Sequence, residues 1–277
     1  MNHRIHSVLI TGCSSGIGYA TAHYLKDRGF RVFPTARKEQ DLERLEREGF
    51  EAVQLDLDDS RSIRQAIEEV LERTGGTLDA LFNNAAWGQP GAVEDLSRDV
   101  LRSQFETNLF GTHELTTLIL PVMRRQGYGR IIYNSSVLGL VAMPYRGAYN
   151  ASKFALEGLV DTLRLELYGT EIYPVLIEPG PILSKFRANA YRKFKENIDV
   201  AKSPHREVYL RLEEKLKQEG AVVPFTLPPE AVAQKVYKAL TARRPKVRYY
   251  VTFPTHLFAF LRRLLPYRGL DEILRRI

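Results

Sequence analysis

Short apolar segments alternate along this chain with longer segments whose apolar residues recur at helical spacing, and no other feature constrains the fold as strongly. An apolar run of about four to eight residues is typical of a buried strand, whereas apolar residues three or four apart are typical of a helix. Strands that alternate with helices form a parallel sheet with helices on both faces. We therefore predict an α/β fold with one doubly wound (Rossmann) parallel sheet. The predicted strands are 7–11, 30–36, 52–55, 78–82, 129–134, 172–178 and 248–252.

Three residues bear on the boundaries and interiors of these elements. Ser60 is a favoured N-cap type, and we expect it to cap the helix predicted over 60–73. Pro174 lacks the N–H that a strand donates to its neighbour, so we expect the sixth strand to begin after it. Asn108 lies inside the helix predicted over 97–125, where Asn is unfavourable, so its side chain is expected to make a specific hydrogen bond.

The sixth and seventh strands are separated by an insertion that is charged but carries scattered aromatic and aliphatic residues. Its span, about 184–218, exceeds the length of most connections in compact domains. Two interpretations stay open: a helical lid over a substrate pocket, or a solvated surface excursion. We expect one domain over 1–252 that includes this insertion, followed by a C-terminal extension over 253–277.

Positive charge is concentrated at the C-terminal end. The net charge is +7 and the pI 9.4, but residues 243–277 alone hold nine Lys or Arg against two acids, so the remainder is neutral. From Leu257 to Leu265 the bulky apolar residues fall on one helical arc, with Arg262 and Arg263 outside it. A basic amphipathic helix fits a membrane surface, yet the same face fits packing against the core or a partner subunit, and both interpretations stay open. Nucleic-acid binding is not expected, because the body is neutral and leucines interrupt the basic tail.

The composition excludes several classes of protein. Cys13 is the single cysteine, so no internal disulfide can form, and no Cys/His spacing suits zinc, so we expect no metal. The residues before the first strand are too few for a signal peptide, and no apolar run approaches the ~18 residues that a membrane-spanning helix needs. A soluble cytoplasmic protein is expected, with peripheral membrane association if the tail binds lipid.

A glycine-rich turn joins the first strand to the first helix. Glycines at such a turn let backbone N–H groups approach a phosphate at the positive end of the helix. The position between a strand and a helix strengthens this interpretation. The segment runs Thr11-Gly-Cys-Ser-Ser-Gly-Ile-Gly18, and we expect it to bind the phosphates of a dinucleotide.

The residues that follow the second strand bear on the choice of dinucleotide. In dinucleotide-binding sheets an acid near this point holds the adenosine ribose hydroxyls, whereas a basic residue accommodates a 2′-phosphate. Here Arg37 and Lys38 follow Ala36, and the first acid is Glu39. The sequence therefore predicts NADP(H) in preference to NAD(H).

Tyr149 and Lys153 stand four residues apart at the start of a segment with helical periodicity. That spacing places both side chains on one face of a helix, with Cβ atoms about 5–6 Å apart. A free phenol titrates near ~10, and a neighbouring Lys charge would lower its pKa toward neutrality. We therefore expect Tyr149 to be a proton donor with a lowered pKa. Because Tyr and Lys at this spacing are also common on solvated helices, the assignment depends on the rest of the chain.

Together these segments resemble the short-chain dehydrogenase/reductase family from Val8 to about Val251. Two positions depart from the family's usual pattern: Ala86 replaces a Gly, and Ser184 replaces a Thr but keeps the hydroxyl. The elements that match, in chain order, are the glycine-rich turn, Asn83-Asn84-Ala85-Ala86, Asn108, Ser136, Tyr149, Lys153 and Pro179-Gly180.

The resemblance implies an oxidoreductase that transfers a hydride between nicotinamide and a carbonyl or alcohol carbon. Tyr149 would exchange the oxygen-bound proton, and Ser136 would hold that oxygen. Lys153 would lower the phenol pKa and bind ribose hydroxyls, while Asn108 would position a water that links Lys153 to solvent. The implied cofactor contacts are Gly12, Ser14, Ser15, Gly16, Ile17, Gly18, Arg37, Lys38, Asp56, Leu57, Asn84, Ala85, Tyr149, Lys153, Pro179, Gly180, Ile182 and Ser184.

Within the family the sequence is most similar to the hydroxysteroid and retinol dehydrogenase branch, which implies a lipophilic substrate of the ketosteroid, retinoid or long-chain aldehyde type. A homo-oligomer, dimer or tetramer, is also implied. Two rival functions stay open. One is a β-ketoacyl thioester reductase whose basic tail docks an acidic carrier protein. The other is a regulatory protein that binds NADP(H) without turnover, although such a protein has no need of Ser136, Tyr149 and Lys153 together.

Overall fold

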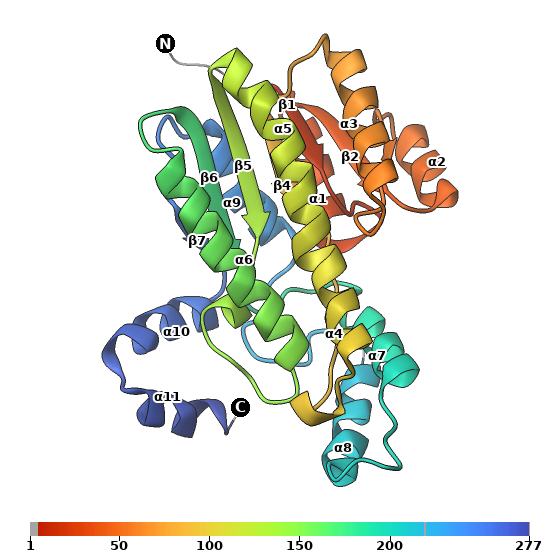
Figure 1. Cartoon of the computed structure of the whole chain (residues 1–277), viewed down its shortest axis with the longest axis vertical. Coiled ribbons are helices and arrows are strands. Elements are labelled where there is room, and N and C mark those ends of the chain that lie inside the picture. Colours follow the sequence, from red (N-terminus) through yellow and green to blue (C-terminus); the bar gives the residue numbers. More distant parts are fainter. Residues whose placement is uncertain (1–4, 219, 277) are drawn as a thin grey trace.

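A computed structural model of the chain, which describes residues 5–218 and 220–276, contains the predicted sheet (Figure 1). Within this described part the strands all run parallel, in the order β3-β2-β1-β4-β5-β6-β7. The predicted doubly wound α/β fold is therefore confirmed. The strands are β1 (Ser7–Ile10), β2 (Arg31–Ala36), β3 (Val53–Gln54), β4 (Ala80–Asn83), β5 (Tyr128–Asn134), β6 (Glu171–Glu178) and β7 (Arg248–Tyr250).

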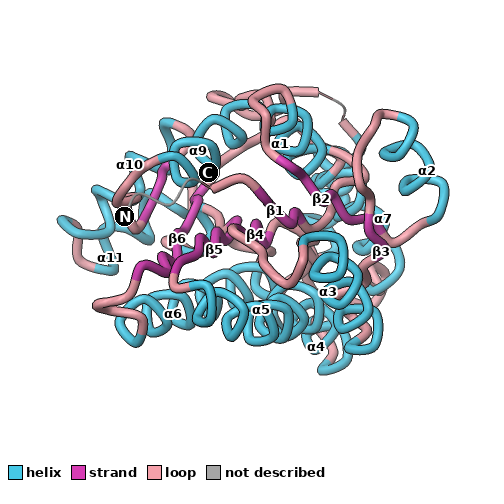
Figure 2. Tube along the Cα trace, turned by 90° about the horizontal axis from the view of Figure 1, so that it is seen from above, coloured by secondary structure: helices cyan, strands magenta, loops and turns pink. Residues whose placement is uncertain are grey.

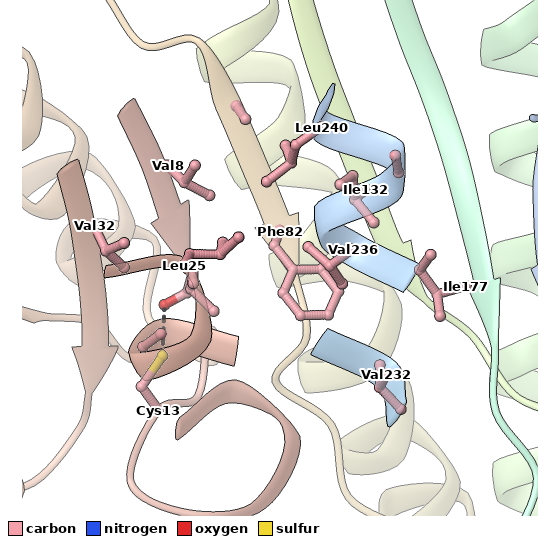
Figure 3. Packing of buried hydrophobic residues seen from close by; sticks show 14 of the residues in the cluster. Val8, Cys13, Leu25, Val32, Phe82, Ile132, Ile177, Val232, Val236 and Leu240 are labelled. Carbon is pink, nitrogen blue, oxygen red and sulfur yellow. Dashed lines mark hydrogen bonds between the residues drawn. The ribbon is translucent and has the colours of Figure 1, made fainter. Parts of the chain in front are cut away.

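Helices cover both faces of the sheet, as the view in Figure 2 shows. On one face, Val232, Val236 and Leu240 of α9 pack against the sheet residues Phe82 and Ile132 (Figure 3). These α9 residues are four apart, so they form one apolar stripe toward the core. The helices on this face are α1 (Gly16–Lys26), α2 (Glu39–Arg47) and α9 (Glu230–Thr241); those on the other are α3 (Ser60–Thr74), α5 (Thr112–Gln126) and α6 (Gly147–Glu166).

The N-cap of α3 lies one residue before the predicted position. Asp59 is extended, and its carboxylate accepts a hydrogen bond from Arg61 N at 2.8 Å. Ser60 is instead the first helical residue, and its hydroxyl donates to Glu114 at 2.6 Å. The prediction that Ser60 caps the helix is therefore wrong, because the neighbouring carboxylate already satisfies the free N–H.

The sixth strand runs through Pro174, contrary to the prediction that it begins afterwards. Pro174 pairs with Ile131 of β5. Leu176 N donates to Val247 O at 3.0 Å on the opposite side of the strand. Pro174, two residues earlier, turns its nitrogen to that same side, where β7 pairs only with residues 176–178. The missing N–H therefore costs no ladder bond.

The helix predicted over 97–125 is present but contains a π-helical segment. A π-helical segment, η2 (Glu106–Gly111), separates α4 (Arg98–Phe105) from α5. A Cβ on Gly111 would lie 1.9 Å from Leu57 O, so only glycine allows this approach. The Leu57 side chain itself is buried in the core, and its carbonyl oxygen packs against Gly111. Single π-helical turns often occur at functional sites, and η2 carries the buried Asn108.

The insertion forms two helices with a core of their own, α7 (Phe186–Asn197) and α8 (Arg206–Lys217). Phe194 and Tyr209 are fully buried within it. The Tyr209 hydroxyl donates to Asp95 and accepts from Ala92 N at 2.8 Å, which ties α8 to the short helix η1 (Val93–Asp95). The helical character of the insertion is thus confirmed, and in Figure 1 it lies beyond the carboxyl ends of the strands.

The C-terminal residues form α10 (Phe253–Leu264) and α11 (Tyr267–Leu274), and their apolar face is divided. Phe258 is buried with Val137 and Val141, whereas Phe260 and Leu264 are 59% and 62% exposed. The apolar face predicted for this segment is therefore shared: one side packs on the core and the other faces outward. No helix among residues 5–218 and 220–276 is long and apolar enough to cross a membrane.

Candidate active site

The predicted site residues gather at the carboxyl ends of the strands. The glycine-rich turn follows β1, Asn84 follows β4, Ser136 follows β5 and Pro179 follows β6. β1 and β4 are neighbours in the sheet, but the helices that follow them cover opposite faces. In a doubly wound sheet such a switch point opens the crevice that binds ligands. Four separate segments therefore converge at one edge of the sheet, where we expect the ligand-binding crevice.

The glycine-rich turn is shaped for a close approach of backbone to ligand. A Cβ on Gly12, whose φ is +73°, would lie 2.9 Å from Ala85 Cα, and one on Gly18 would lie 2.4 Å from Gly12 O. Ser15 is the N-cap of α1, but its side chain makes no capping hydrogen bond. The first N–H groups of α1 are thus open to a phosphate, and the helix dipole favours negative charge there. These residues fit the pyrophosphate of a dinucleotide.

A hydrogen-bond network joins this turn to the helix that carries Tyr149. Thr11 Oγ1 accepts from the N–H groups of Asn84 and Ala85, both at 2.9 Å. Asn134 Nδ2 donates to Asn84 Oδ1 at 2.9 Å, and Asn134 O accepts from Lys153 Nζ at 2.7 Å. Asn134 is a site residue that was not predicted from the sequence. Its place at the end of the predicted fifth strand is the signal that could have found it.

Basic side chains lie where the adenosine ribose of a dinucleotide would be. Arg37 NH1 is 3.9 Å from Asp56 Oδ1, too far for a hydrogen bond, and the Arg37 side chain is 61% exposed. Lys38 is the exposed N-cap of α2. Arg44, which the sequence analysis did not predict, donates to Ser14 O at 2.8 Å. The arginine after β2 therefore remains available to an anionic group.

The loop after β6 starts with a tightly packed Pro-Gly pair. Pro179 O accepts from Val137 N at 2.8 Å, which ties the loop to the segment after β5. A Cβ on Gly180 would lie 2.2 Å from Thr252 Oγ1, and the Thr252 side chain is fully buried. Only glycine allows that approach, so this part of the crevice wall has a defined shape.

Farther along the same loop, Ser184 faces the glycine-rich turn. A Cβ placed on Gly16 would lie 3.1 Å from Ser184 Cβ. Ser184 Oγ also accepts from Phe186 N at 3.3 Å, at the start of α7. Ile182 forms an isolated bridge with Leu227, which closes the base of the insertion. The loop therefore packs against the glycine-rich turn at this point.

Tyr149 and Lys153 lie on the first turns of α6, as predicted. Lys153 Nζ is 5.6 Å from the centroid of the Tyr149 ring, and the Lys153 side chain is buried. Ser136 is also buried, and its hydroxyl accepts from Leu138 N at 3.1 Å. The structure thus brings Tyr149, Lys153 and Ser136 together.

The electrostatics of this group differ from the prediction. Burial raises the pKa of Tyr149 to about 12, and interactions with the Ser136 hydroxyl and the Arg146 charge oppose it only in part. Burial likewise lowers the pKa of Lys153 to about 8, against the influence of the Glu157 charge. The predicted lowering of the phenol pKa by Lys153 is therefore wrong for the chain itself, because loss of solvation outweighs the nearby charges.

Asn108 makes the specific hydrogen bonds that its position predicted. Its Oδ1 accepts from Trp87 N at 3.1 Å, and its Nδ2 donates to Trp87 O at 3.0 Å and to Ser152 Oγ at 3.1 Å. Ser152 immediately precedes Lys153 on α6. Asn108 therefore fixes the segment after β4 against α6. Its expected role in positioning a water stays a prediction.

Aromatic side chains line the crevice beside Tyr149. The Phe186 ring packs edge-on to the Tyr149 ring, with centroids 5.3 Å apart. A Cβ on Gly88 would lie 2.6 Å from Phe186 Cζ and 3.4 Å from Tyr149 Cδ2, so Gly88 leaves room at this point. Phe186 is the first residue of α7, which makes the insertion part of the wall. In the described part of the chain, no group of three His, Cys, Asp or Glu side chains could hold a metal ion.

Comparisons with known proteins agree with this arrangement. A family model described as short chain dehydrogenase matches residues 6–195. An uncharacterized oxidoreductase, YbbO, of Escherichia coli strain K12 is 44% identical over 97% of this chain and 94% of its own length.

Two relatives with named activities also match. An NADPH-dependent 3-dehydrocapnine reductase of Ornithobacterium rhinotracheale is 33% identical over 96% of this chain and 94% of its own length. The human 17-beta-hydroxysteroid dehydrogenase type 1 is 36% identical over 88% of this chain and 77% of its own length.

Proposed function

The chain belongs to the short-chain dehydrogenase family of oxidoreductases, and from the geometry of its active site we propose that it uses NADP(H) and acts on the carbonyl or alcohol carbon of a lipophilic substrate. The observation that carries this proposal is the convergence of Tyr149, Ser136 and Lys153 at the carboxyl edge of the sheet, beside the glycine-rich turn. When bound, the reduced nicotinamide supplies the hydride.

Tyr149 supplies the proton in the proposed reaction. The phenol is protonated at neutral pH and can donate to a carbonyl oxygen, although its raised pKa makes it a weaker acid than a free phenol. The Ser136 hydroxyl lies next to the phenol and holds that oxygen. Lys153, with a pKa of about 8, can exchange a proton within the physiological range.

The choice of NADP(H) is supported by the positive charge of the two residues that follow β2. Arg37 and Lys38 are exposed at this point, and the acid of the site, Asp56, stands 3.9 Å from Arg37. A 2′-phosphate would gain a charge-assisted hydrogen bond from Arg37. The NADPH-dependent relative from Ornithobacterium rhinotracheale is consistent with this choice.

A lipophilic substrate is supported by the wall beside Tyr149. Phe186 is 37% exposed and presents its ring to the crevice, and Gly88 leaves space against it. We propose that the α7–α8 insertion acts as a lid over this apolar surface. The hydroxysteroid dehydrogenase among the relatives points to the same substrate type.

Two further assignments concern the surroundings of the protein. Phe253, Leu257, Phe260 and Leu264 form an exposed strip along α10, and we propose that this strip lets a cytoplasmic protein contact a membrane surface peripherally. We also propose a homo-oligomer, either a dimer or a tetramer, because apolar side chains such as Leu159 are exposed on α6 and could pack against another subunit. Liposome co-sedimentation with and without residues 253–277, and light scattering of the full chain, test these assignments.

The proposed chemistry is tested by replacing Tyr149 with Phe. NADPH oxidation is measured with dodecanal, a ketosteroid and acetoacetyl-coenzyme A. We expect Tyr149→Phe to lower turnover by about 100-fold or more, because general acid catalysis contributes about that much, while NADPH binding measured by fluorescence is retained. Tyr173→Phe, at the far end of β6, is the matched control.

Three results would contradict parts of this proposal. Unchanged turnover by the Tyr149 variant would remove the phenol from the mechanism. Turnover of acetoacetyl-coenzyme A alone would replace the free lipophilic substrate by a thioester. Binding of NADPH by the wild type without turnover of any carbonyl would indicate a regulatory protein.

A further inference from the structure

Two arginines stand at the mouth of the crevice, at the starts of two helices. Arg146 is the N-cap residue of α6, three residues before Tyr149. Arg187 lies in the first turn of α7, next to Phe186, whose ring contacts Tyr149. The N-terminal ends of both helices add partial positive charge to this region. Positive charge from two arginines and two helix ends therefore lies on this side of the site.

Arg146 has no counter-ion among the residues that the structure describes. Its guanidinium makes no hydrogen bond or ion pair there, although the side chain is more than half buried. Burial and the charge of Arg187 lower the pKa of Arg146. Among the described residues, Arg187 donates to the neutral acceptors Gln218 O at 2.8 Å and Gly220 O at 3.2 Å.

The acids of the neighbouring segment already have partners. Glu94 interacts with His205 at 2.6 Å, and Asp95 accepts from Ser203 at 2.6 Å and from Tyr209. The Arg146 side chain also plays no capping role, since the N-cap of α6 has no side-chain hydrogen bond.

A buried cation without a partner is costly, and local features that cost stability are expected chiefly at functional sites. We propose that Arg146, with Arg187 beside it, binds an anionic group that the substrate carries close to its reacting carbonyl, a specificity that rests on the proposed reductase activity. The substrate class is then an acidic lipophilic carbonyl compound. A planar guanidinium suits a carboxylate, sulfonate or phosphate because it can donate two parallel hydrogen bonds.

The position of Arg146 explains why the anion lies near the carbonyl and not at the far end of the substrate. Arg146 is the N-cap of α6, three residues before Tyr149, and its charge is among the interactions that oppose the rise in the pKa of the phenol. An anionic group held there would lie within reach of the same phenol that donates the proton. The apolar part of the substrate would then extend along Phe186 and the insertion.

The test compares acids with their neutral esters. NADPH-dependent kcat/KM is measured for 2-oxododecanoate and 3-oxododecanoate, for their methyl esters and for dodecanal. We expect the wild type to prefer an acid over its ester by about 10-fold or more. Arg146→Gln should lower kcat/KM for the acid by about 30-fold, since truncating one partner of a buried charge pair costs about 2 kcal/mol or more. Dodecanal should change less than about 3-fold.

Matched variants distinguish the effect of losing the Arg146 charge from the effect of disturbing the fold. Arg146→Lys should restore part of the acid preference, whereas Arg192→Gln, which removes an exposed arginine of α7 paired with Glu196, should leave it unchanged. An equal loss for dodecanal and the acids would assign Arg146 a structural role and overturn the proposal. An increase in the KM for NADPH with an unchanged acid-to-ester ratio would overturn it as well, because Arg146 would then contact the cofactor.

A binding readout keeps the test independent of turnover. Calorimetric titration of the NADPH-bound protein with dodecanoate should show binding that Arg146→Gln weakens about 10-fold or more, and methyl dodecanoate should bind more weakly than dodecanoate. If no carbonyl is reduced, the proposed function fails, but weaker binding of dodecanoate to the variant still supports the anion site. Equal binding of dodecanoate and its methyl ester overturns the anion site even if reduction occurs.

Discussion

Replacing Lys153 by Met should make the cofactor-free protein more stable while it destroys activity. Lys153 is 2% exposed, and its ammonium has one hydrogen-bond partner, Asn134 O, at 2.7 Å. Burial lowers its pKa from 10.5 to about 8. The folded state therefore disfavours the charged form, and Met, an unbranched apolar side chain of similar length, removes the charge without opening a large cavity.

The pKa shift sets the size and the pH dependence of the effect. At about 1.36 kcal/mol per pKa unit, holding the charged amine in the fold costs roughly 3 kcal/mol below pH 8. Loss of the hydrogen bond to Asn134 O offsets about 1 kcal/mol of the gain. Because the pKa of Lys153 is lower in the folded state, the cost of its charge is absent above pH 10.5. The cost grows as the pH falls and is complete below about pH 8. The variant should thus exceed the wild type by about 2 kcal/mol at pH 7, and most of that difference should disappear by pH 10.

Urea unfolding of both proteins at pH 7, 8, 9 and 10 measures the difference directly. Other titrating groups are common to both proteins, so they cancel in the comparison. Lys238→Met, on the exposed side of α9, is the control and should show no such pH dependence. A difference that stays constant from pH 7 to pH 10, or a variant less stable than the wild type at pH 7, would refute the assignment of Lys153 as a desolvated charge held for catalysis.

Three further changes have expected outcomes. Arg37→Asp should weaken NADPH binding by about 10-fold or more and improve NADH binding, because the new carboxylate repels a 2′-phosphate and accepts from ribose hydroxyls; an unchanged ratio of the two KM values would contradict the NADP(H) assignment. Gly18→Ala should abolish cofactor binding or unfold the turn, since the new Cβ would lie 2.4 Å from Gly12 O. NADPH binding equal to that of the wild type would contradict the assignment of the glycine-rich turn to the pyrophosphate. Arg248→Met should destabilise the fold by about 3 kcal/mol in urea unfolding, because it leaves the buried carboxylates of Glu178 and Glu157 without their shared cation. A loss of stability below about 1 kcal/mol would show that the two carboxylates share a proton and do not need the arginine.

Much of the architecture could be predicted from residue patterns. The alternation of strands and helices predicted the parallel sheet, and each predicted strand is present with shifts of a few residues at its ends. The glycine-rich turn was assigned from its place between a strand and a helix, and Gly12 and Gly18 occupy positions where a side chain would collide. Tyr149 and Lys153 lie on one side of a helix because their spacing demands it. Their catalytic roles stay predictions.

Other features depended on contacts between distant segments. Pro174 is tolerated within β6 because β7 is too short to reach it, and no pattern around Pro174 reports the length of β7. The apolar arc of the tail is divided because the segment that contains Val137 and Val141 covers only one side of α10. Asn134 became a site residue only once the fold placed its carbonyl against Lys153.

Spacing along the chain by itself determined the order of the elements, the turn that suits a dinucleotide and the side-by-side placement of Tyr149 and Lys153. The tertiary structure alone decided the ionisation of these groups: Tyr149 has a raised pKa and Lys153 a lowered one. It also decided that Arg146 faces the crevice without an acidic partner in the described chain. The physical reason is that periodicity acts over a few residues, whereas solvation and charge pairing depend on which remote segments close over a side chain.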